Sequence, residues 1–489
     1  MNRLLALLLA CCCALSAGAC TTIIAGKNAT DNGAVLVART EDGRLGNHPV
    51  YYLRHPARQQ GYVFVSARNP RFSYPMPDHL LSYSGMPDFD GQNRSYEEAG
   101  FNSVGVAMSA TETIYSSARA LHVDPYVPGG VSESEVTSIV LPQIRSARAG
   151  VVLLGQIIQT RGATEGMGIA LADKHEAWYL ENGGGHQWVA VRIPDDAYFV
   201  SANQGRIHQV DLGDQQNVMA APGIAGFARD SGLLPQSSDT RFDFFRAFSK
   251  DSADDASYNY RRVWTLQQLF TPSRPSHSDV DGDAPMFLRP DRALSVSAVE
   301  SALQNHYQGQ GDQYDPYLSP VPLTRYRPIS VFRAQEAHVQ MVRDHLPAPI
   351  ANIEYIELGM TALGIYVPFY QGAAIPAAYQ TGGASADNVS AWWRFRKLQV
   401  LVMQNYPKYA PQVQAAYARL NQQIELRQQA FEAAYLREYA RSPRRAQQML
   451  DGFTRQTVEQ VFALTDQLSN AVMSQLAVDT SVIWQYAGG

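Results

Sequence analysis

Two short apolar runs joined by a turn follow Cys20, and they constrain the fold more than any other feature of this chain. Residues 20–25 and 34–38 are largely apolar and contain β-branched side chains, and Asp31-Asn32-Gly33 lies between them. This pattern predicts a β-hairpin. The second run ends at Arg39 and Asp42, so the hairpin would return both side chains beside Cys20. The alternative for this Arg-x-x-Asp spacing is an ordinary surface ion pair.

The first nineteen residues have the pattern of an export signal. Arg3 supplies a positive charge, residues 4–15 are apolar, and the small residues Ala17, Gly18 and Ala19 form a cleavage site. The apolar run is too short to span a bilayer, and no later stretch has eighteen consecutive apolar residues. We therefore expect a signal peptide over residues 1–19, export to the periplasm or the medium, and no membrane span.

Cleavage after Ala19 would make Cys20 the first residue and the only cysteine, because the other three lie in the leader. One interpretation is a lipid anchor on Cys20, although lipid attachment usually needs Leu three residues earlier, where this chain has Ala17. The other interpretation is an N-terminal nucleophile whose own α-amine, with a pKa of roughly 7.7–8.0, accepts the thiol proton. That chemistry needs a cation near the sulfur and an acceptor for the amine. Arg39 and Asp42 supply these groups.

Composition excludes several classes of protein. The 489 residues contain 45% hydrophobic and 17% charged residues, which excludes a disordered chain, and four cysteines are too few for a disulfide scaffold. A net charge of −5 gives no electrostatic footprint for nucleic acid. None of the eleven histidines has a metal-ligand spacing, and no Gly-x-Ser-x-Gly motif is present. We expect no metal, no cofactor and no nucleic-acid partner.

The opening segment CTTIIAGKNATDNGAVLVARTEDG at 20–43 resembles the dipeptidases of the N-terminal-nucleophile cysteine peptidases, relatives of bile salt hydrolase and penicillin V acylase. Further motifs with this resemblance are spread over most of the chain after the leader: NSVGVAMSATETI (102–114), DPY (124–126), EAWYLENGGGHQWVAVRIPDD (176–196), VSANQGRI (200–207), YRRVW (260–264) and SAWWRFR (390–396).

The resemblance implies an α+β protein with a four-layer αββα fold, in which two antiparallel sheets are stacked between layers of helices. It also implies hydrolysis of a dipeptide or short peptide through a thioester on cysteine, without a metal. By position in the motifs, Cys20 is the nucleophile, Arg39 the arginine beside the sulfur and Asp42 the aspartate that positions the α-amine. Asn203 matches the asparagine near the oxyanion.

For the remaining site residues the sequence leaves alternatives. The second active-site arginine is Arg262 or Arg241, and we prefer Arg262. Where the acylase branch has an oxyanion asparagine, this chain has Thr111-Glu112, so the oxyanion donor is Thr111 or a backbone N–H. That departure favours a dipeptidase over an acylase. His186 follows a glycine run and either lines the substrate site or is an ordinary loop histidine.

Two other functions stay open at this point. The first is an N-acyl amidase that acts on penicillin V, bile salts or acyl-homoserine lactones. The second is a lipid-anchored binding protein that has kept the scaffold without catalysis. The sequence does not fix the oligomeric state, and a homo-oligomer is possible.

The rest of the chain predicts a core at 20–399 and a helical extension at 400–489. Strands are expected over 177–180, 187–193 and 197–202, and across 100–114 with Val104 on the apolar face. A helix pair is expected between 133 and 162, with a break at Pro142. Apolar residues at helical spacing predict one long helix over 411–439 and a second after a break at Gly452.

Overall fold

The predicted hairpin after Cys20 is confirmed and lies at the centre of a seven-stranded sheet. The computed structural model describes residues 20–43, 46–89, 96–112, 114–235, 241–274, 282–318 and 326–483, so the predicted signal peptide lies outside the described residues. In the hairpin, β1 (Thr21–Ala25) pairs with β2 (Val35–Asp42), and Thr22 lies opposite Arg39. Gly33 in the turn has φ +73°, a conformation that glycine adopts without strain.

Two antiparallel sheets form the core. The first has the spatial order β16 (Phe287–Leu288), β12 (Tyr198–Ser201), β1, β2, β17 (Ala334–Val342), β18 (Asn352–Leu358) and β19 (Val367–Tyr370). The second has the order β14 (Val218–Ala220), β11 (Trp188–Ile193), β10 (Ala177–Asn182), β9 (Met167–Ala172), β8 (Ala107–Glu112) and β7 (Ala99–Phe101). The sheets face each other where β2 contacts β8 and β9.

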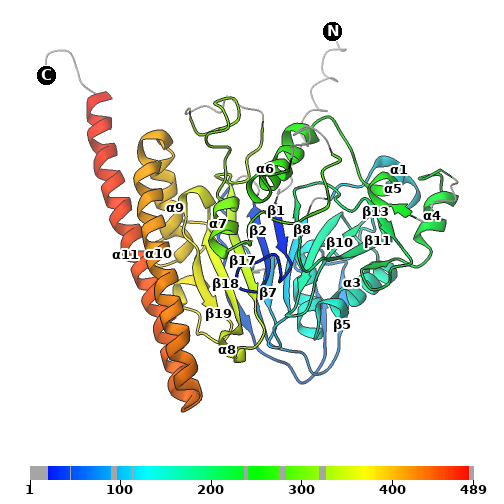
Figure 1. Cartoon of the computed structure of the whole chain (residues 1–489), viewed down its shortest axis with the longest axis horizontal. Coiled ribbons are helices and arrows are strands. Elements are labelled where there is room, and N and C mark those ends of the chain that lie inside the picture. Colours follow the sequence, from blue (N-terminus) through cyan, green and yellow to red (C-terminus); the bar gives the residue numbers. More distant parts are fainter. Residues whose placement is uncertain are drawn as a thin grey trace, which may run out of the picture.

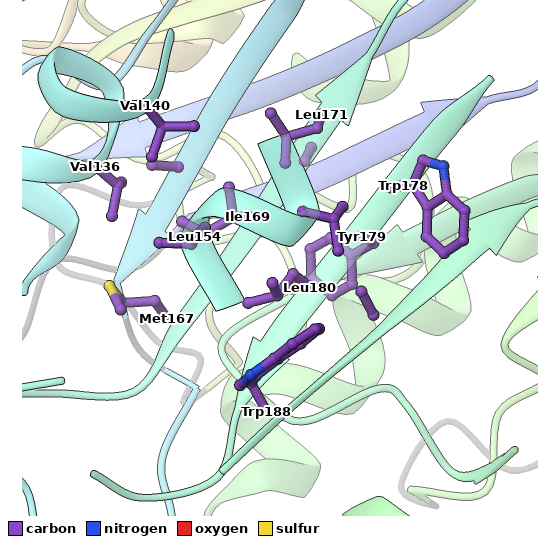
Figure 2. Packing of buried hydrophobic residues seen from close by; sticks show 14 of the residues in the cluster. Val136, Val140, Leu154, Met167, Ile169, Leu171, Trp178, Tyr179, Leu180 and Trp188 are labelled. Atoms are coloured by element: carbon purple, nitrogen blue, oxygen red, sulfur yellow. The ribbon is translucent and has the colours of Figure 1, made fainter. Parts of the chain in front are cut away.

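Helices cover the outer face of each sheet, so the expected four-layer arrangement is confirmed (Figure 1). On the second sheet, α3 (Ala147–Arg161) packs against β9, β10 and β11, and α2 (Glu133–Val140) packs against β8. Figure 2 shows Leu154 of α3 among strand residues of this buried cluster such as Ile169 and Leu180. On the first sheet, α6 (Arg261–Phe270) and α7 (Val296–Leu303) bury their apolar sides against β1, β2 and β17.

The C-terminal part is a helical hairpin, as predicted, but its boundaries differ from those expected. Helix α10 spans Tyr406–Tyr439 and α11 spans Pro443–Ile483, and α9 (Ala391–Val402) lies beside both. The break at Gly452 is wrong, because α11 continues through it and the chain turns at 440–442 instead. One glycine costs about 1 kcal/mol in a helix, which the packing of Leu450 and Phe453 against the core outweighs. The hairpin runs along one side of the molecule in Figure 1.

The remaining elements are short and connect or cover the core. They include α1 (Ala118–Val123), α4 (Ile224–Asp230), α5 (Phe244–Phe248), α8 (Ala348–Ala351) and the two-stranded pairs β3–β6 (Leu53–His55, Tyr83–Gly85), β4–β5 (Tyr62–Val65, Ser73–Met76) and β13–β15 (Gln209–Asp211, Arg241–Asp243). Within the described ranges, no helix combines the length and apolarity that crossing a membrane requires.

The other local predictions have mixed outcomes. The three predicted strands near 177–202 correspond to β10, β11 and β12, and α2 ends at Val140 before a short 3₁₀ turn that contains Pro142. The single strand over 100–114 is wrong, since β7 and β8 are separate strands. Val104 lies in the turn between them and is 46% exposed. Alternation alone did not reveal this turn, although Asn102 caps it by accepting from two backbone N–H groups.

Candidate active site

Cys20 lies between the two sheets, where strand alternation places its thiol on the same face as Arg39 and Glu41. Side chains two residues apart on a strand point to one face, and β1 and β2 are in register with Thr22 opposite Arg39. The Arg39 guanidinium lies 3.4 Å from the Cys20 sulfur through Nη1. The thiol donates to Glu41 Oε2 at 3.2 Å, and Glu41 also forms a direct ion pair with Arg39. All three side chains are buried.

The electrostatics of this cluster keep the thiol protonated. Burial raises the pKa of Cys20 well above its ordinary value, and the negative charge of Glu41 raises it further, while Arg39 lowers it. Burial also raises the pKa of Glu41 to about 7, against the opposing effect of Arg39. The guanidinium is therefore shared between the sulfur and a carboxyl group. Activation of the thiol must overcome the charge of Glu41.

A chain of buried hydrogen bonds fixes the position of Arg39. Arg39 Nε donates to Ser109 Oγ on β8 at 2.9 Å, and Ser109 Oγ lies 2.9 Å from His338 Nε2. His338 Nδ1 lies 2.9 Å from Glu336. Burial lowers the pKa of His338, and a neutral ring with its hydrogen on Nδ1 satisfies both neighbours. The chain runs from a cation to a carboxylate through two neutral groups, and it fixes the guanidinium beside the sulfur.

On the other side of Cys20, Arg262 connects the backbone to Asn203. Arg262 Nη1 donates to the Cys20 carbonyl at 2.7 Å and to Thr21 Oγ1 at 2.9 Å, and Nη2 donates to Asn203 Oδ1 at 2.7 Å. Asn203 reaches this position because β12 pairs with β1, and Asn259 joins them by accepting from Arg262 Nη2. Burial, together with the charge of Arg327, lowers the pKa of Arg262 to about 9.

Asp42 is fully buried and forms an ion pair with Arg327. Its Oδ1 has no hydrogen-bond partner among the described residues, although the atom is inaccessible to solvent. Burial raises the pKa of Asp42, which Arg327 opposes most strongly. Its charge in turn raises the pKa of the Cys20 thiol, so the two groups interact.

The other predicted residues have different surroundings. Thr111 is buried on β8, two residues after Ser109, and therefore faces the first sheet. Glu112 ends that strand, and its side chain lies outside the described residues. His186 is bound to Asp124 through both its backbone N–H and its ring nitrogen Nδ1, at 2.7 and 2.8 Å. Arg241 lies on β15 and is exposed, whereas Arg262 contacts the Cys20 carbonyl.

Several members of the site were not predicted. Glu41 could have been predicted from the sequence, because it lies two residues after Arg39 at the end of the predicted hairpin. Glu336 and His338 are two of the four polar residues of β17, which places them directly opposite Glu41 and Arg39. Arg327 gave no local signal. Among the described residues, no group of His, Cys, Asp and Glu side chains is arranged to hold a metal ion.

Comparison with known proteins identifies the family of this chain. The sequence profile of peptidase family C69 matches residues 19–419. The chain belongs to this family. The match begins directly before Cys20 and includes all the site residues described above. It ends within α10, so α11 lies beyond the matched region.

Relatives with dipeptidase names cover most of the chain. A protein of Salmonella dublin described as a probable dipeptidase is 47% identical over 361 residues, which are 72% of this chain and 81% of the relative. A probable dipeptidase of Latilactobacillus sakei is 34% identical over 391 residues, 79% of this chain and 82% of the relative. The penicillin V acylase of Agrobacterium tumefaciens has 12% identity and a TM-score of 0.32 over 72% of this chain and 86% of its own. The predicted membership of the cysteine peptidase group is confirmed by the family match.

Replacing Glu41 by glutamine should lower the pKa of the Cys20 thiol by about one unit or more, because it removes the negative charge nearest the sulfur. The rate of alkylation by iodoacetamide as a function of pH measures this pKa in the protein without residues 1–19. Glu300→Gln is the matched control, since Glu300 is equally buried but lies on α7 and bonds to Asn421. A thiol pKa that is unchanged or higher in Glu41→Gln would show that Glu41 does not oppose the thiolate.

Proposed function

We propose that this peptidase is an exported cysteine dipeptidase in which removal of residues 1–19 makes Cys20 an N-terminal nucleophile. The observation that carries the proposal is the pair of arginines at Cys20, with Arg39 at its sulfur and Arg262 at its carbonyl. The family supplies the reaction class, and the names of the relatives supply the substrate class. The proposed signal peptide and export rest on the sequence pattern of the leader alone.

The freed α-amine of Cys20 is the proposed base. In the uncleaved chain the Cys20 nitrogen is an amide and cannot accept a proton, so we expect that chain to be inactive. After cleavage the amine titrates near roughly 7.7–8.0, and a useful fraction is neutral at working pH. The buried Oδ1 of Asp42 lacks a hydrogen-bond partner among the described residues, which makes it a suitable acceptor for the new amine. Arg327 holds the other side of that carboxylate.

The reaction then has two steps. The amine takes the thiol proton, and the thiolate attacks the peptide carbonyl of the substrate. The carbon–nitrogen bond breaks, the second amino acid leaves with a proton from the α-ammonium, and the first stays on sulfur as a thioester. Water, deprotonated by the amine, hydrolyses the thioester and releases the first amino acid. Because the carbonyl oxygen becomes negative in both steps, each step needs hydrogen-bond donors at that oxygen.

Asn203 is the proposed donor to this oxyanion. Arg262 binds its Oδ1, so the amide nitrogen is the side-chain group of Asn203 that can donate. Loss of one such donor typically costs about 10²–10³ in rate. Thr111 is the second candidate donor to the oxyanion. It lies on β8 of the opposite sheet, two residues after Ser109, and its side chain points toward the first sheet. We propose a substrate contact for Glu112 only from its position at the end of β8. His186 is the weaker candidate because Asp124 already occupies its Nδ1.

A substrate panel tests this function against the alternatives. The processed protein is incubated with unblocked dipeptides, penicillin V, a conjugated bile salt and an acyl-homoserine lactone, and released amines are separated by chromatography. We expect kcat/KM for the best dipeptide to exceed that for each acyl amide by at least about 100-fold. Faster hydrolysis of an acyl amide would assign the protein to the amidases. No hydrolysis of any substrate would support a binding protein.

A further inference from the structure

Three buried glutamates surround Arg39 on the sulfur side of Cys20, and the mechanism above uses none of them as a base or nucleophile. Glu41, Glu98 and Glu133, the carboxylate cluster, are 3%, 0% and 1% exposed. Glu41 forms an ion pair with Arg39, and Glu133 Oε1 lies 3.8 Å from Arg39 Nη1. Glu98 precedes β7, and its pKa responds to the charges of Glu41 and Arg39.

Among the described residues, the three carboxyl groups of the cluster lie around one guanidinium, that of Arg39. A buried carboxylate without a cation is strongly disfavoured, and the group takes up a proton instead. Burial and the neighbouring charge of Glu41 accordingly raise the pKa of Glu98 well above its ordinary value. Glu336 adds a fourth carboxyl group nearby, but it has His338 as a partner. An additional cation in the cluster would allow Glu98 to ionise.

Polar atoms without hydrogen-bond partners in this cluster indicate which donors and acceptors a ligand bound there would need. Both carboxyl oxygens of Glu98 are inaccessible to solvent and have no hydrogen-bond partner among the described residues. The same is true of Nη2 of Arg39, the guanidinium that lies beside the sulfur. Two acceptors, the oxygens of Glu98, and one donor, Arg39 Nη2, therefore lack hydrogen-bond partners among the described residues near Cys20. The first residue of a peptide carries a matching pair, since its α-ammonium donates and its carbonyl oxygen accepts.

The geometry of attack requires this ammonium to lie near the sulfur. A reacting thiolate and carbonyl carbon approach to about 3–3.5 Å. The amino nitrogen of that residue is two bonds from the carbonyl carbon, about 2.5 Å away. The ammonium therefore lies within about 6 Å of the sulfur. Glu41 is 3.2 Å from the sulfur, and Glu133 reaches the same guanidinium nitrogen that lies 3.4 Å from it.

We infer that the carboxylate cluster binds the α-ammonium of the substrate's first residue and so restricts hydrolysis to peptides with a free amino terminus. Glu98 and Glu133 are the specificity residues, and Arg39 Nη2 is a further donor, in addition to Asn203, to the carbonyl oxygen of the same residue. The inference rests on the proposed function, because it takes Cys20 as the attacking group. It gives a physical reason for a preference for dipeptides over acylated amines, which have no positive charge at this position.

The test compares alanyl-alanine with N-acetyl-alanyl-alanine as substrates of the processed enzyme, with released alanine measured by chromatography. The unblocked dipeptide should have a kcat/KM at least about 100-fold higher. Because loss of a hydrogen bond to a charged group typically costs at least about tenfold in affinity, Glu98→Gln and Glu133→Gln should each reduce this ratio about tenfold or more. Glu300→Gln, the buried control on α7, should keep the ratio of the unmodified enzyme.

Several results would overturn the inference. A ratio that stays unchanged in both variants, or an equal loss on both substrates, would mean that the glutamates only position Arg39. Hydrolysis of both substrates at similar rates by the unmodified enzyme would also exclude it. Failure of the proposed function looks different, since the unmodified enzyme would then release no alanine from alanyl-alanine.

A binding measurement keeps the inference testable if the glutamate variants do not fold. Cys20→Ala in the processed form keeps the carboxylate cluster and does not consume substrate. Calorimetry should show alanyl-alanine binding at least about tenfold more tightly than the N-acetylated peptide. Equal or tighter binding of the acetylated peptide would contradict recognition of the ammonium.

Discussion

Processed protein with Cys20 replaced by alanine should hydrolyse dipeptides at least about 10⁴-fold more slowly than the unmodified enzyme. The substitution removes the only cysteine among the described residues, whose sulfur lies beside the Arg39 guanidinium, and loss of a nucleophile typically costs roughly 10⁴–10⁶ in rate. Rates from purified protein, with alanine release followed by chromatography, measure the effect. The loss should appear in kcat, since the groups that bind substrate remain.

The thermal midpoint of Cys20→Ala separates loss of chemistry from loss of structure. The side chain is small, and its removal should change the free energy of unfolding by no more than about 1–2 kcal/mol. A variant with normal stability and more than a tenth of the normal activity would exclude Cys20 as the nucleophile.

Replacing Arg262 by methionine should reduce stability and activity together. The guanidinium is fully buried and donates to the Cys20 carbonyl, Asn203 and Asn259, which connect three separate parts of the chain. Loss of these hydrogen bonds should lower the free energy of unfolding by about 3 kcal/mol or more. Activity should fall at least about 100-fold, because Asn203 and Cys20 lose their common support. Urea unfolding and dipeptide hydrolysis measure the two effects.

Arg241→Met is the matched control for this variant, because Arg241 was the alternative for the second active-site arginine. It is exposed on β15, and its replacement should change the free energy of unfolding by no more than about 0.5 kcal/mol. If Arg241→Met lost activity while Arg262→Met kept it, the assignment of the second arginine would be reversed.

Local patterns were sufficient for the hairpin that creates the site. The turn at Asp31-Asn32-Gly33 and the flanking β-branched runs predicted β1 and β2, and the register brings Arg39 to within 3.4 Å of the sulfur. Ser109 and His338 could not be located in this way. They come to Arg39 from other strands, one of them in the opposite sheet, and no local spacing encodes such a contact.

The errors in helix and strand boundaries have two different physical causes. Gly452 and Val104 were both judged from the pattern of residue types, but tertiary packing decided the first position and local side-chain hydrogen bonds decided the second. Around Gly452, apolar neighbours pack against the first sheet and keep α11 continuous. At Val104, the Asn102 side chain binds the backbone of the turn, so the chain reverses where alternation predicted a strand.

The most direct test of the central claim is the intact mass of the active protein recovered from the exported fraction. If Cys20 is an N-terminal nucleophile, the mass corresponds to a chain that begins at unmodified Cys20, and this species hydrolyses dipeptides. An active species that keeps residues before Cys20, or that carries acyl groups on it, would have no free α-amine beside the thiol. That result would contradict the account.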